Sequence, residues 1–260
     1  MEQKRKSKFF QVFHIKYLLY DFVKLTWILL LWIFQTPKIR YCNKEGKMPK
    51  LKGRALIVCN HTWWMDPITI IMTFWRRRIH TLAAKELGGP HKLIQWIKRR
   101  LLFIDVDRKK LDIRSYNRCI EALKNDQVLL VFPEGRFVFE DEIQPFKGGT
   151  ALMALQTKTP IYPVYLNGHY RLFHPIRMAV GEPIRVEQEW QGAMDSEAVN
   201  HLNERMREEV QKLREVVESG MKQSELEARD AFKRTKRDEL QKKAAEKERI
   251  WREAQEQGKI

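Results

Sequence analysis

The chain has 260 residues, 43% hydrophobic and 32% charged, which is enough for one α/β domain with an appended segment. Lysine and arginine exceed aspartate and glutamate by 49 to 33, and the formal net charge of +16 favours anionic partners: phosphate esters, acidic lipid or nucleic acid. The three cysteines have neither disulfide-pairing nor metal-ligand spacing, so the composition predicts a reducing compartment without a disulfide framework.

The N-terminal segment is apolar behind a basic leader. Its densest apolar stretch, residues 25–34, is half of the ~20 residues that a membrane-spanning helix needs. No small-residue cleavage site of a signal peptide follows it. We therefore predict that residues 1–36 form one or two membrane-associated helices lying in the membrane surface, with a single spanning helix or an ordinary core helix as alternatives. Residues 37–53 are predicted to be a polar linker.

Residues 54–220 are predicted to form the main domain. Strands are expected where apolar runs occur, at 55–59, 79–84, 101–106, 128–132, 160–166, 178–180 and 184–186. Helices are expected after Pro67 and over 90–100, 112–124 and 148–156. Pro160 and Pro163 predict an edge strand or a bulge for 160–166. The alternation predicts an α/β fold with a largely parallel or mixed sheet flanked by helices.

The C-terminal part of the chain is helical in pattern. From about Ser196 an apolar stripe predicts a helix packed on the domain. In residues 221–260 apolar side chains are sparse and charges pair at i,i+4, as in Glu225 with Arg229. We predict a charged C-terminal helix, solvated or weakly coiled-coil, with disorder as the alternative, and we assign it no chemistry.

His61 and Asp66 are the candidate catalytic pair. His61 follows a buried strand, and Asp66-Pro67 predicts an N-cap followed by proline at the first helical position. On a continuous helix the two side chains would point about 140° apart, so the turn between them must be non-helical. A carboxylate on one imidazole nitrogen leaves the other nitrogen as a base. No serine or cysteine lies between them, which predicts a substrate hydroxyl as nucleophile. The alternative is a helix cap beside an ordinary turn histidine.

Two more polar turns follow apolar strands. Asp107-Arg108-Lys109 offers cations for a phosphate, and residues 133–136, Pro-Glu-Gly-Arg, offer a carboxylate and a flexible backbone. Each alone has a plain alternative, a solvated charge or a simple turn. Their shared position at the carboxyl ends of strands predicts one site at a sheet edge.

With these motifs the sequence resembles the glycerolipid acyltransferases typified by 1-acyl-sn-glycerol-3-phosphate (lysophosphatidic acid) acyltransferase. Asn-His-x-x-x-x-Asp stands at 60–66 and Phe-Pro-Glu-Gly at 132–135, with weaker matches at 103–108 and 160–164. The resemblance covers about residues 54–186. It departs from the family pattern before Arg108, where a glycine is often found, and at Arg136, which follows glycine without an intervening threonine.

The resemblance implies transfer of a fatty acyl group from acyl-CoA or acyl-carrier protein to the hydroxyl of lysophosphatidic acid, giving phosphatidic acid. It implies His61 as general base oriented by Asp66. Acceptor binding falls to four residues: Arg108, Glu134, Gly135 and Arg136. No metal is required, and no cofactor beyond the acyl-thioester co-substrate. The alternatives are another lysophospholipid or hydroxylated lipid acceptor and, less favoured, a non-catalytic basic protein of the membrane surface.

The expected partners are a lipid bilayer, the lysophospholipid acceptor and the acyl carrier. A membrane-associated protein with its catalytic domain on the cytoplasmic side follows from the same resemblance. The tryptophans cluster among apolar residues at 27–32, 63–64 and 75, not between lysines as in a base-stacking surface, so nucleic acid is not expected. Acyl chain length, the choice of carrier and the oligomeric state stay open.

Overall fold

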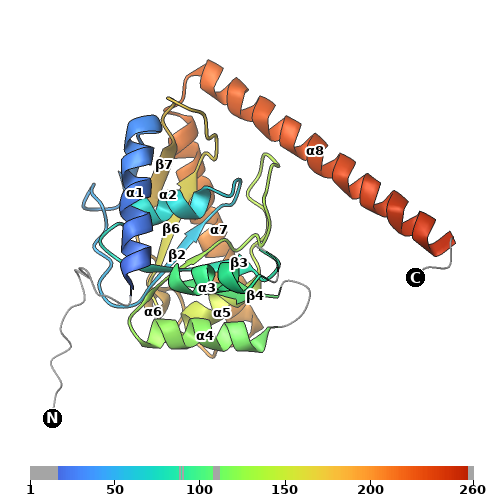
Figure 1. Ribbon diagram of the computed structural model, residues 1–260. Helices are drawn as coiled ribbons and strands as arrows, with labels where there is room; N and C mark the ends of the chain where they lie inside the picture. Colours follow the sequence, from blue (N-terminus) through green and yellow to red (C-terminus); the bar gives the residue numbers. More distant parts are fainter. Residues whose placement is uncertain (1–16, 88, 90, 108–111, 257–260) are drawn as a thin grey trace, which may run out of the picture.

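A computed structural model of the chain describes residues 17–87, 89, 91–107 and 112–256 (Figure 1). The elements follow in chain order: α1 (Leu18–Phe34), β1 (Lys38–Cys42), β2 (Ala55–Cys59), α2 (Asp66–Thr73), β3 (Ile79–Ala84), α3 (Lys92–Arg100), β4 (Phe103–Val106), α4 (Ile113–Lys124), β5 (Val128–Val131), α5 (Gly148–Thr157), β6 (Ile161–Leu166), β7 (Arg177–Gly181), α6 (Val186–Glu189), α7 (Ser196–Glu218) and α8 (Gln223–Glu256). Helices alternate with strands over most of the chain, which confirms the predicted α/β fold.

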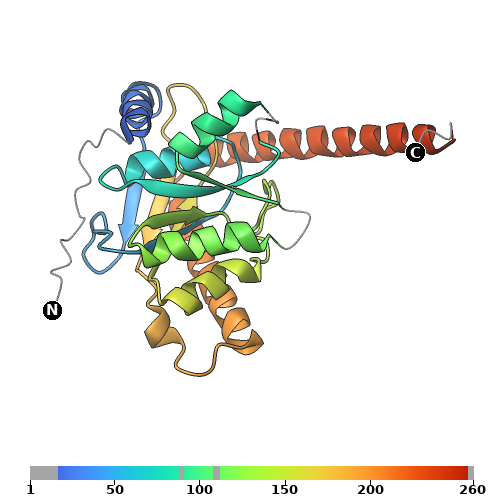
Figure 2. The same cartoon turned by 60° about the horizontal axis from the view of Figure 1, so that its bottom comes forward.

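A seven-stranded sheet forms the centre, in the order β1-β7-β6-β2-β5-β3-β4. Every neighbouring pair is parallel except β6 with β7, which is antiparallel, so the sheet is mixed. Helices α4, α5 and α7 pack together on one face, and α2 covers the other with α1 outside it (Figures 1 and 2). Parallel strands covered on both faces are continuously apolar, as the sequence of β2 is.

Strand β2 lies in the middle of this sheet, and all five of its residues are buried. Leu56 and Val58 belong to the core beneath α4, α5 and α7, whereas Ile57 and Cys59 belong to the core beneath α2. Alternate side chains of a strand point to opposite faces, so β2 is fixed from both sides. The residue pair that follows β2, Asn60-His61, therefore starts from a rigid base at the carboxyl edge of the sheet.

The two prolines predicted an edge strand or a bulge. Strand β6 lies inside the sheet, between β2 and β7, so the first of these alternatives, the edge position, is wrong. Its pairing with β7 runs from Val164 to Leu166 and resumes only at a single bridge between Ile161 and Ile184. Pro163, which has no N–H to donate, falls in this gap and lies close to Gly181, where an added Cβ would be 3.0 Å from the proline Cγ. An interior proline is thus accommodated where the ladder lacks a pair.

Two other predicted segments need correction. Lys38–Cys42, within the predicted linker 37–53, forms strand β1 and pairs with β7 at the edge of the sheet. The predicted strand at 184–186 is reduced to the single bridge at Ile184, because helix α6 begins at Val186. The polar composition of 37–53 concealed a strand, whereas the apolar residues of 184–186 predicted a longer strand than the backbone forms.

Helix α1 has 17 residues, and none of the helices that the structure describes has the length and apolar content needed to cross a membrane. Several of its large apolar side chains are exposed: Leu18, Phe22, Leu25, Leu29, Leu30, Ile33 and Phe34. The predicted basic leader, and the apolar residues between it and α1, lie in 1–16, outside the described residues. The membrane association of residues 1–36 stays a prediction.

The C-terminal segment forms one long helix, α8, of 34 residues. Its second half projects from the body of the molecule (Figures 1 and 2). Its first half is packed, since Arg229 and Lys233 are only 4% and 6% exposed. The predicted solvated helix is therefore correct for the projecting half and wrong for the half that begins at Gln223.

Candidate active site

His61 and Asp66 meet at the carboxyl end of β2. The imidazole Nδ1 lies 3.0 Å from Asp66 Oδ2, across the short turn that joins β2 to α2. The turn is non-helical until Asp66, where α2 starts with Pro67 in its first turn. The structure thus brings together the two side chains that the sequence spacing singles out.

The prediction that Asp66 is the N-cap of α2 is wrong, because Met65 occupies that position. The carboxylate is fully buried and instead closes the turn. Its Oδ2 also accepts the backbone N–H groups of Thr62 and Trp63, each at 2.7 Å, and its Oδ1 accepts the hydroxyl of Tyr170 at 2.7 Å. These donors compensate for burial of a polar group and fix the face that the carboxylate presents to the imidazole.

Tyr170 is a site residue that the sequence analysis missed. It lies in the connection between β6 and β7, 104 positions from Asp66, and no motif marks it. Burial, followed by the charge of Asp66, raises its pKa well above the ordinary value. Its hydroxyl therefore stays protonated and donates to the carboxylate.

The imidazole of His61 is held between two aromatic rings. Phe132 stacks on it with centroids 4.0 Å apart and planes 20° apart, and Phe137 lies tilted at 4.4 Å. The ring is 8% exposed, and no side chain in the described part of the chain hydrogen-bonds its Nε2. With Nδ1 bound to Asp66, Nε2 is the nitrogen available to take a proton from a substrate.

Asn60 explains the first position of the signature. Its side-chain amide donates to the carbonyl of Leu166 at 2.9 Å, and its carbonyl accepts the Leu166 N–H at 2.8 Å. This two-way bond ties the end of β2 to the end of β6. It therefore sets where the next residue, His61, leaves the sheet.

Glu134 connects the second signature to the first. Its buried carboxylate accepts the backbone N–H of His61 at 2.9 Å and that of Gln144 at 3.2 Å, one on each oxygen. Burial raises the pKa of Glu134 to about 7, against the opposing effect of these hydrogen bonds. Glu134 thus holds the backbone of His61, and its predicted contact with the acceptor stays a prediction.

Gly135 adopts a backbone conformation that favours glycine, and it lies against the end of the Lys147 side chain. Its φ is +70°, which favours glycine, and an added Cβ would lie 2.7 Å from both Cε and Nζ of Lys147. The lysine side chain therefore crosses directly over the glycine backbone. Lys147, just before α5, is a second residue that the sequence analysis missed, although the Lys-Gly-Gly sequence at a helix start was a signal for it.

Of the two arginines predicted to bind the acceptor, the structure describes Arg136 and not Arg108. Arg136 is about half exposed and pairs with Glu140 at 2.8 Å. Arg108 lies outside the described residues, but the residues on either side of that loop, Asp107 and Asp112, both line the cavity described next. Arg136 does not line it.

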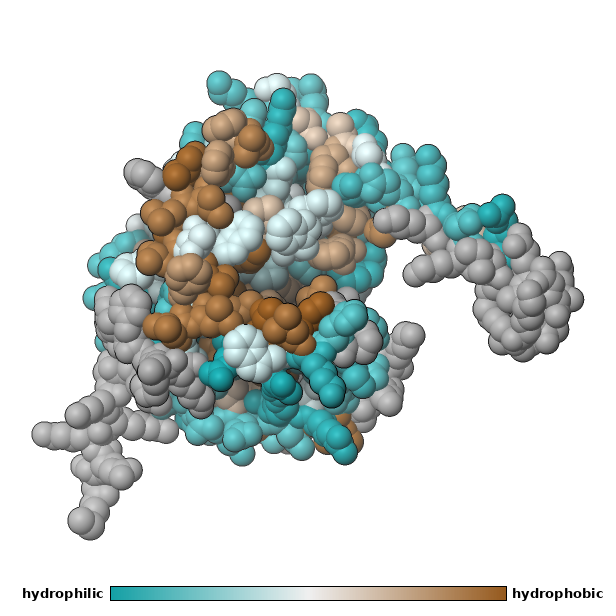
Figure 3. Space-filling view, viewed as in Figure 1, coloured by the Kyte–Doolittle hydropathy of each residue, from teal (hydrophilic) through white to brown (hydrophobic). Residues whose placement is uncertain are grey.

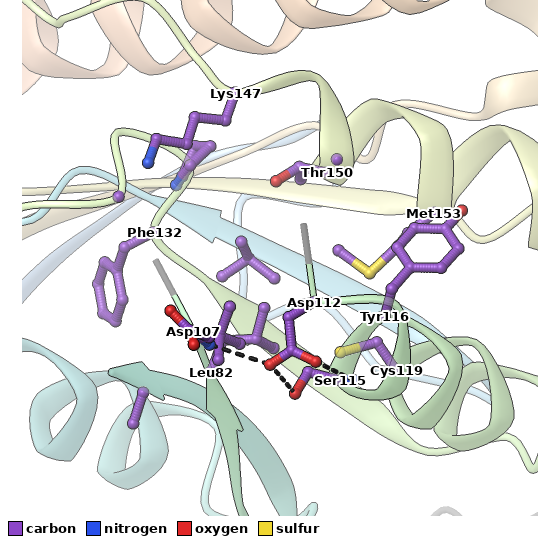
Figure 4. Close-up of a pocket in the computed structure, with 16 residues that line it drawn as sticks. Leu82, Asp107, Asp112, Ser115, Tyr116, Cys119, Phe132, Lys147, Thr150 and Met153 are labelled. Carbon is purple, nitrogen blue, oxygen red and sulfur yellow. Dashed lines mark hydrogen bonds between the residues drawn. The ribbon is translucent and has the colours of Figure 1, made fainter. Parts of the chain in front are cut away.

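A cavity of about 350 Å³ opens beside this cluster, between α4 and α5 at the carboxyl ends of β3, β4 and β5. Figure 4 shows Lys147, Phe132 and Asp107 on one side of it and Met153, Tyr116 and Cys119 opposite. Most of the remaining lining is apolar and includes Leu82, Val106 and Val131. Phe132 lines the cavity and also stacks on His61, so the cavity and the candidate base share a wall.

The site combines a buried imidazole–carboxylate pair, a lysine beside a glycine turn, and an apolar cavity. Among the described residues no group of three or more histidine, cysteine, aspartate or glutamate side chains is placed to hold a metal ion. Proton abstraction from a hydroxyl, with an anion and a hydrocarbon chain held alongside, is the chemistry that these parts support.

Comparison with known proteins places the chain in a family. A family model described as Acyltransferase matches residues 38–167, half of the 260-residue chain. A 1-acyl-sn-glycerol-3-phosphate acyltransferase of Bacillus subtilis (strain 168) is 30% identical over 151 residues, covering 56% of this chain and 73% of the relative. One of Streptococcus pneumoniae (strain ATCC BAA-255 / R6) is 27% identical and covers 75% and 73% respectively.

The fold has a match among crystal structures. The 1-acyl-sn-glycerophosphate (LPA) acyltransferase PlsC from Thermotoga maritima aligns with a TM-score of 0.56 at 22% identity, covering 77% of this chain and 80% of that one. At this identity the match shows the fold alone. Together with the family model and the sequence relatives, it leads to one conclusion: the chain belongs to the acyltransferase family and is an O-acyltransferase.

Proposed function

We propose that the protein transfers a fatty acyl group from acyl-CoA or acyl-carrier protein to the hydroxyl of lysophosphatidic acid, giving phosphatidic acid. The observation that carries the proposal is the His61–Asp66 pair, with Nδ1 bound at 3.0 Å and Nε2 left for a substrate. The names of the relatives, which are 1-acyl-sn-glycerol-3-phosphate acyltransferases, support the choice of acceptor.

Direct transfer fits the site better than an acyl-enzyme. The nearest thiol along the chain is Cys59, which is fully buried, and this burial raises its pKa well above the ordinary value. Since the thiolate is the nucleophilic form, Cys59 is a poor nucleophile. Cys119, which lines the cavity, is also buried, and burial raises its pKa to about 12, so we take the acceptor hydroxyl as the group that attacks.

In the proposed reaction Nε2 of His61 takes the proton of the acceptor hydroxyl as its oxygen attacks the thioester carbonyl. Asp66 keeps Nδ1–H pointing at itself and stabilises the imidazolium that forms. The tetrahedral intermediate then collapses, the C–S bond breaks, and the imidazolium returns its proton to the leaving sulfur. The products are the acylated lipid and the free thiol of the carrier.

Lys147 is proposed to bind the phosphate of the acceptor together with Arg108. Lys147 Nζ lies over the glycine turn and on the wall of the cavity, which is where a cation would meet a phosphate beside the base. The apolar lining suits a hydrocarbon chain. Arg136, whose guanidinium is already paired with Glu140, is assigned a lesser role. Arg136 was predicted to bind the acceptor, and its pairing with Glu140 departs from that prediction. The second candidate acceptor is therefore another lysophospholipid or a hydroxylated lipid.

A membrane surface is proposed as the place of the reaction, with the catalytic domain on the cytoplasmic side. Figure 3 shows hydrophobic side chains gathered over α1 and continuing across this face of the molecule. The exposed Phe173 extends the surface, since its N–H donates to the Phe34 carbonyl at 2.8 Å and their rings lie 5.7 Å apart. Apolar area beside basic residues is what an anionic bilayer binds.

The test is a panel of lysolipids and hydroxylated lipids, each offered with acyl-CoA and with acyl-carrier protein, and read by mass spectrometry. His61→Ala serves as the inactive control. We expect phosphatidic acid as the main product with lysophosphatidic acid as acceptor. Faster acylation of an acceptor without a phosphate would overturn the choice of lysophosphatidic acid.

A further inference from the structure

Helix α8 lies outside the matched family region, which ends at residue 167, yet its first half contacts loops of the active site. It packs on two loops that contain site residues. One is the turn from His61 to Asp66. The other is the segment 136–140, which follows the Pro-Glu-Gly motif and extends toward α8 in Figure 1.

The contact with the first loop is made through Trp63. The ring of Phe232 meets the Trp63 ring edge-on, with centroids 5.3 Å apart and planes 73° apart. The ammonium group of Lys236 lies 5.2 Å from the centre of the same ring. The backbone N–H of Trp63 is one of the donors to Asp66 Oδ2, at 2.7 Å. Phe232 and Lys236 thus fix a residue that in turn orients the carboxylate.

The contact with the second loop is made through backbone carbonyls. Lys233 Nζ donates to the carbonyl of Glu140 at 3.2 Å, and Arg237 donates to the carbonyl of Phe139 at 2.9 Å. The same loop is bonded to the candidate base, because the N–H of Val138 donates to the carbonyl of His61 at 2.7 Å. Both loops that α8 contacts are therefore joined to His61, one by containing it and the other by a hydrogen bond to its main-chain carbonyl.

The packed half of α8 is anchored by two ion pairs, one of which includes the buried Arg229. Arg229 pairs with Glu218 of α7 at 2.5 Å, and Arg177 of β7 pairs with Glu225 at 2.7 Å. Removing Glu218 would leave the charge of the buried Arg229 without this partner, which is unfavourable. These pairs fix the start of α8 on the domain.

We propose that Phe232 is a positioning residue for the His61–Asp66 pair. We also propose that the first half of α8 holds both active-site loops in their positions relative to each other. The inference rests on the proposed function of that pair. The projecting half of α8, which includes the exposed Leu240, has no part in it.

The test compares four full-length variants by steady-state kinetics and thermal unfolding. Phe232→Ala should lower kcat about 10- to 100-fold, because small displacements of catalytic groups have effects of this size, with KM for both substrates near the wild-type value. Phe232→Tyr should restore most of the turnover, since it keeps the ring that meets Trp63. Leu240→Ala is the matched control on the projecting half and should leave turnover unchanged.

Lys236→Ala is the fourth variant. Because Lys236 is partly exposed, this variant is expected to fold even if Phe232→Ala does not. It removes the cation over Trp63 and should lower kcat about two- to fivefold. Wild-type kcat in folded Phe232→Ala or in Lys236→Ala, beside an inactive His61→Ala, would overturn this inference and leave the proposed function standing. Retained turnover in His61→Ala would instead overturn the proposed function.

Discussion

The carboxylate of Glu134 accepts the backbone N–H of His61 at 2.9 Å, across 73 positions of sequence. The two signature motifs are therefore joined by a hydrogen bond to the main chain of the candidate base, in addition to their shared position at the sheet edge. The glutamate of Phe-Pro-Glu-Gly holds the imidazole-bearing residue, and the glycine after it makes room for Lys147.

Replacing His61 by alanine should remove the base and leave the fold intact, because the ring makes one side-chain hydrogen bond and lies at the rim of the core. We expect turnover to fall by roughly 10²–10⁴-fold. Product formation by mass spectrometry and a circular dichroism spectrum check this together. A folded variant with most of the wild-type turnover would show that another group takes the proton.

Replacing Asp66 by asparagine should affect both activity and stability. The carboxylate accepts two backbone N–H groups and Nδ1 on one oxygen and the Tyr170 hydroxyl on the other, whereas an amide offers only one accepting oxygen. We expect a loss of turnover of roughly 10²-fold or more and about 1–3 kcal/mol of stability. Chemical denaturation beside kcat measures both, and unchanged values of both would reduce Asp66 to an ordinary helix residue.

Glu134 should make the protein less stable as the pH rises from about 4.5 to 7. Its pKa is about 7 in the folded protein and 4.5 ordinarily, so within this window the folded state binds more protons than the unfolded state. The loss should be on the order of 3 kcal/mol over the window. Glu134→Gln does not titrate and should lack this component. The check is unfolding free energy against pH for both proteins; parallel curves would refute it.

Lys147→Ala should weaken binding of a phosphorylated acceptor. Because Lys147 Nζ lies over Gly135 at the cavity wall, its loss should raise the acceptor KM about tenfold and leave the donor KM unchanged. Arg136→Ala should raise the acceptor KM less, since that arginine is paired with Glu140 and does not line the cavity. An increase confined to the donor KM would move Lys147 to the carrier side of the site.

Polar substitutions on α1 should weaken membrane binding without destabilising the domain. Phe22 and Leu29 are 67% and 55% exposed, so serine at both positions removes apolar area that only a bilayer would cover. Vesicle affinity should fall more than tenfold, given about 1.5–3 kcal/mol per buried side chain. Met194→Ser, at an exposed position between α6 and α7, is the control. Normal sedimentation of the double variant with anionic vesicles would refute the proposed role of α1 in membrane binding.

The part of the site that the sequence predicts is the part that is local. A buried strand, a short turn and Pro67 at a helix start are enough to bring His61 to Asp66, because all three lie within one strand–turn–helix unit. Tyr170 could not be placed in this way, since it lies 104 positions from Asp66 and no motif marks it. Lys147 is closer in the chain to Gly135, and the Lys-Gly-Gly sequence before α5 was the signal for it.

The same reasoning explains the corrections to the fold. The rule that keeps proline at sheet edges concerns a missing N–H, and at Pro163 the ladder lacks a pair on that side, beside Gly181. The charges of α8 follow an i,i+4 pattern whether or not the helix is packed, so the pattern could not show that Arg229 and Lys233 are buried.

The connection between β6 and β7 joins the candidate active site to the proposed membrane surface. It carries Tyr170, bonded to Asp66 at 2.7 Å, and three residues later Phe173, on the apolar surface that α1 shares. Three residues of chain reach at most about 11 Å. On the proposed membrane surface, this short connection keeps the catalytic carboxylate close to the lipid headgroups. A lysolipid can then present its hydroxyl to His61 while its hydrocarbon tail is still in the leaflet, and the enzyme has no need to extract it into water.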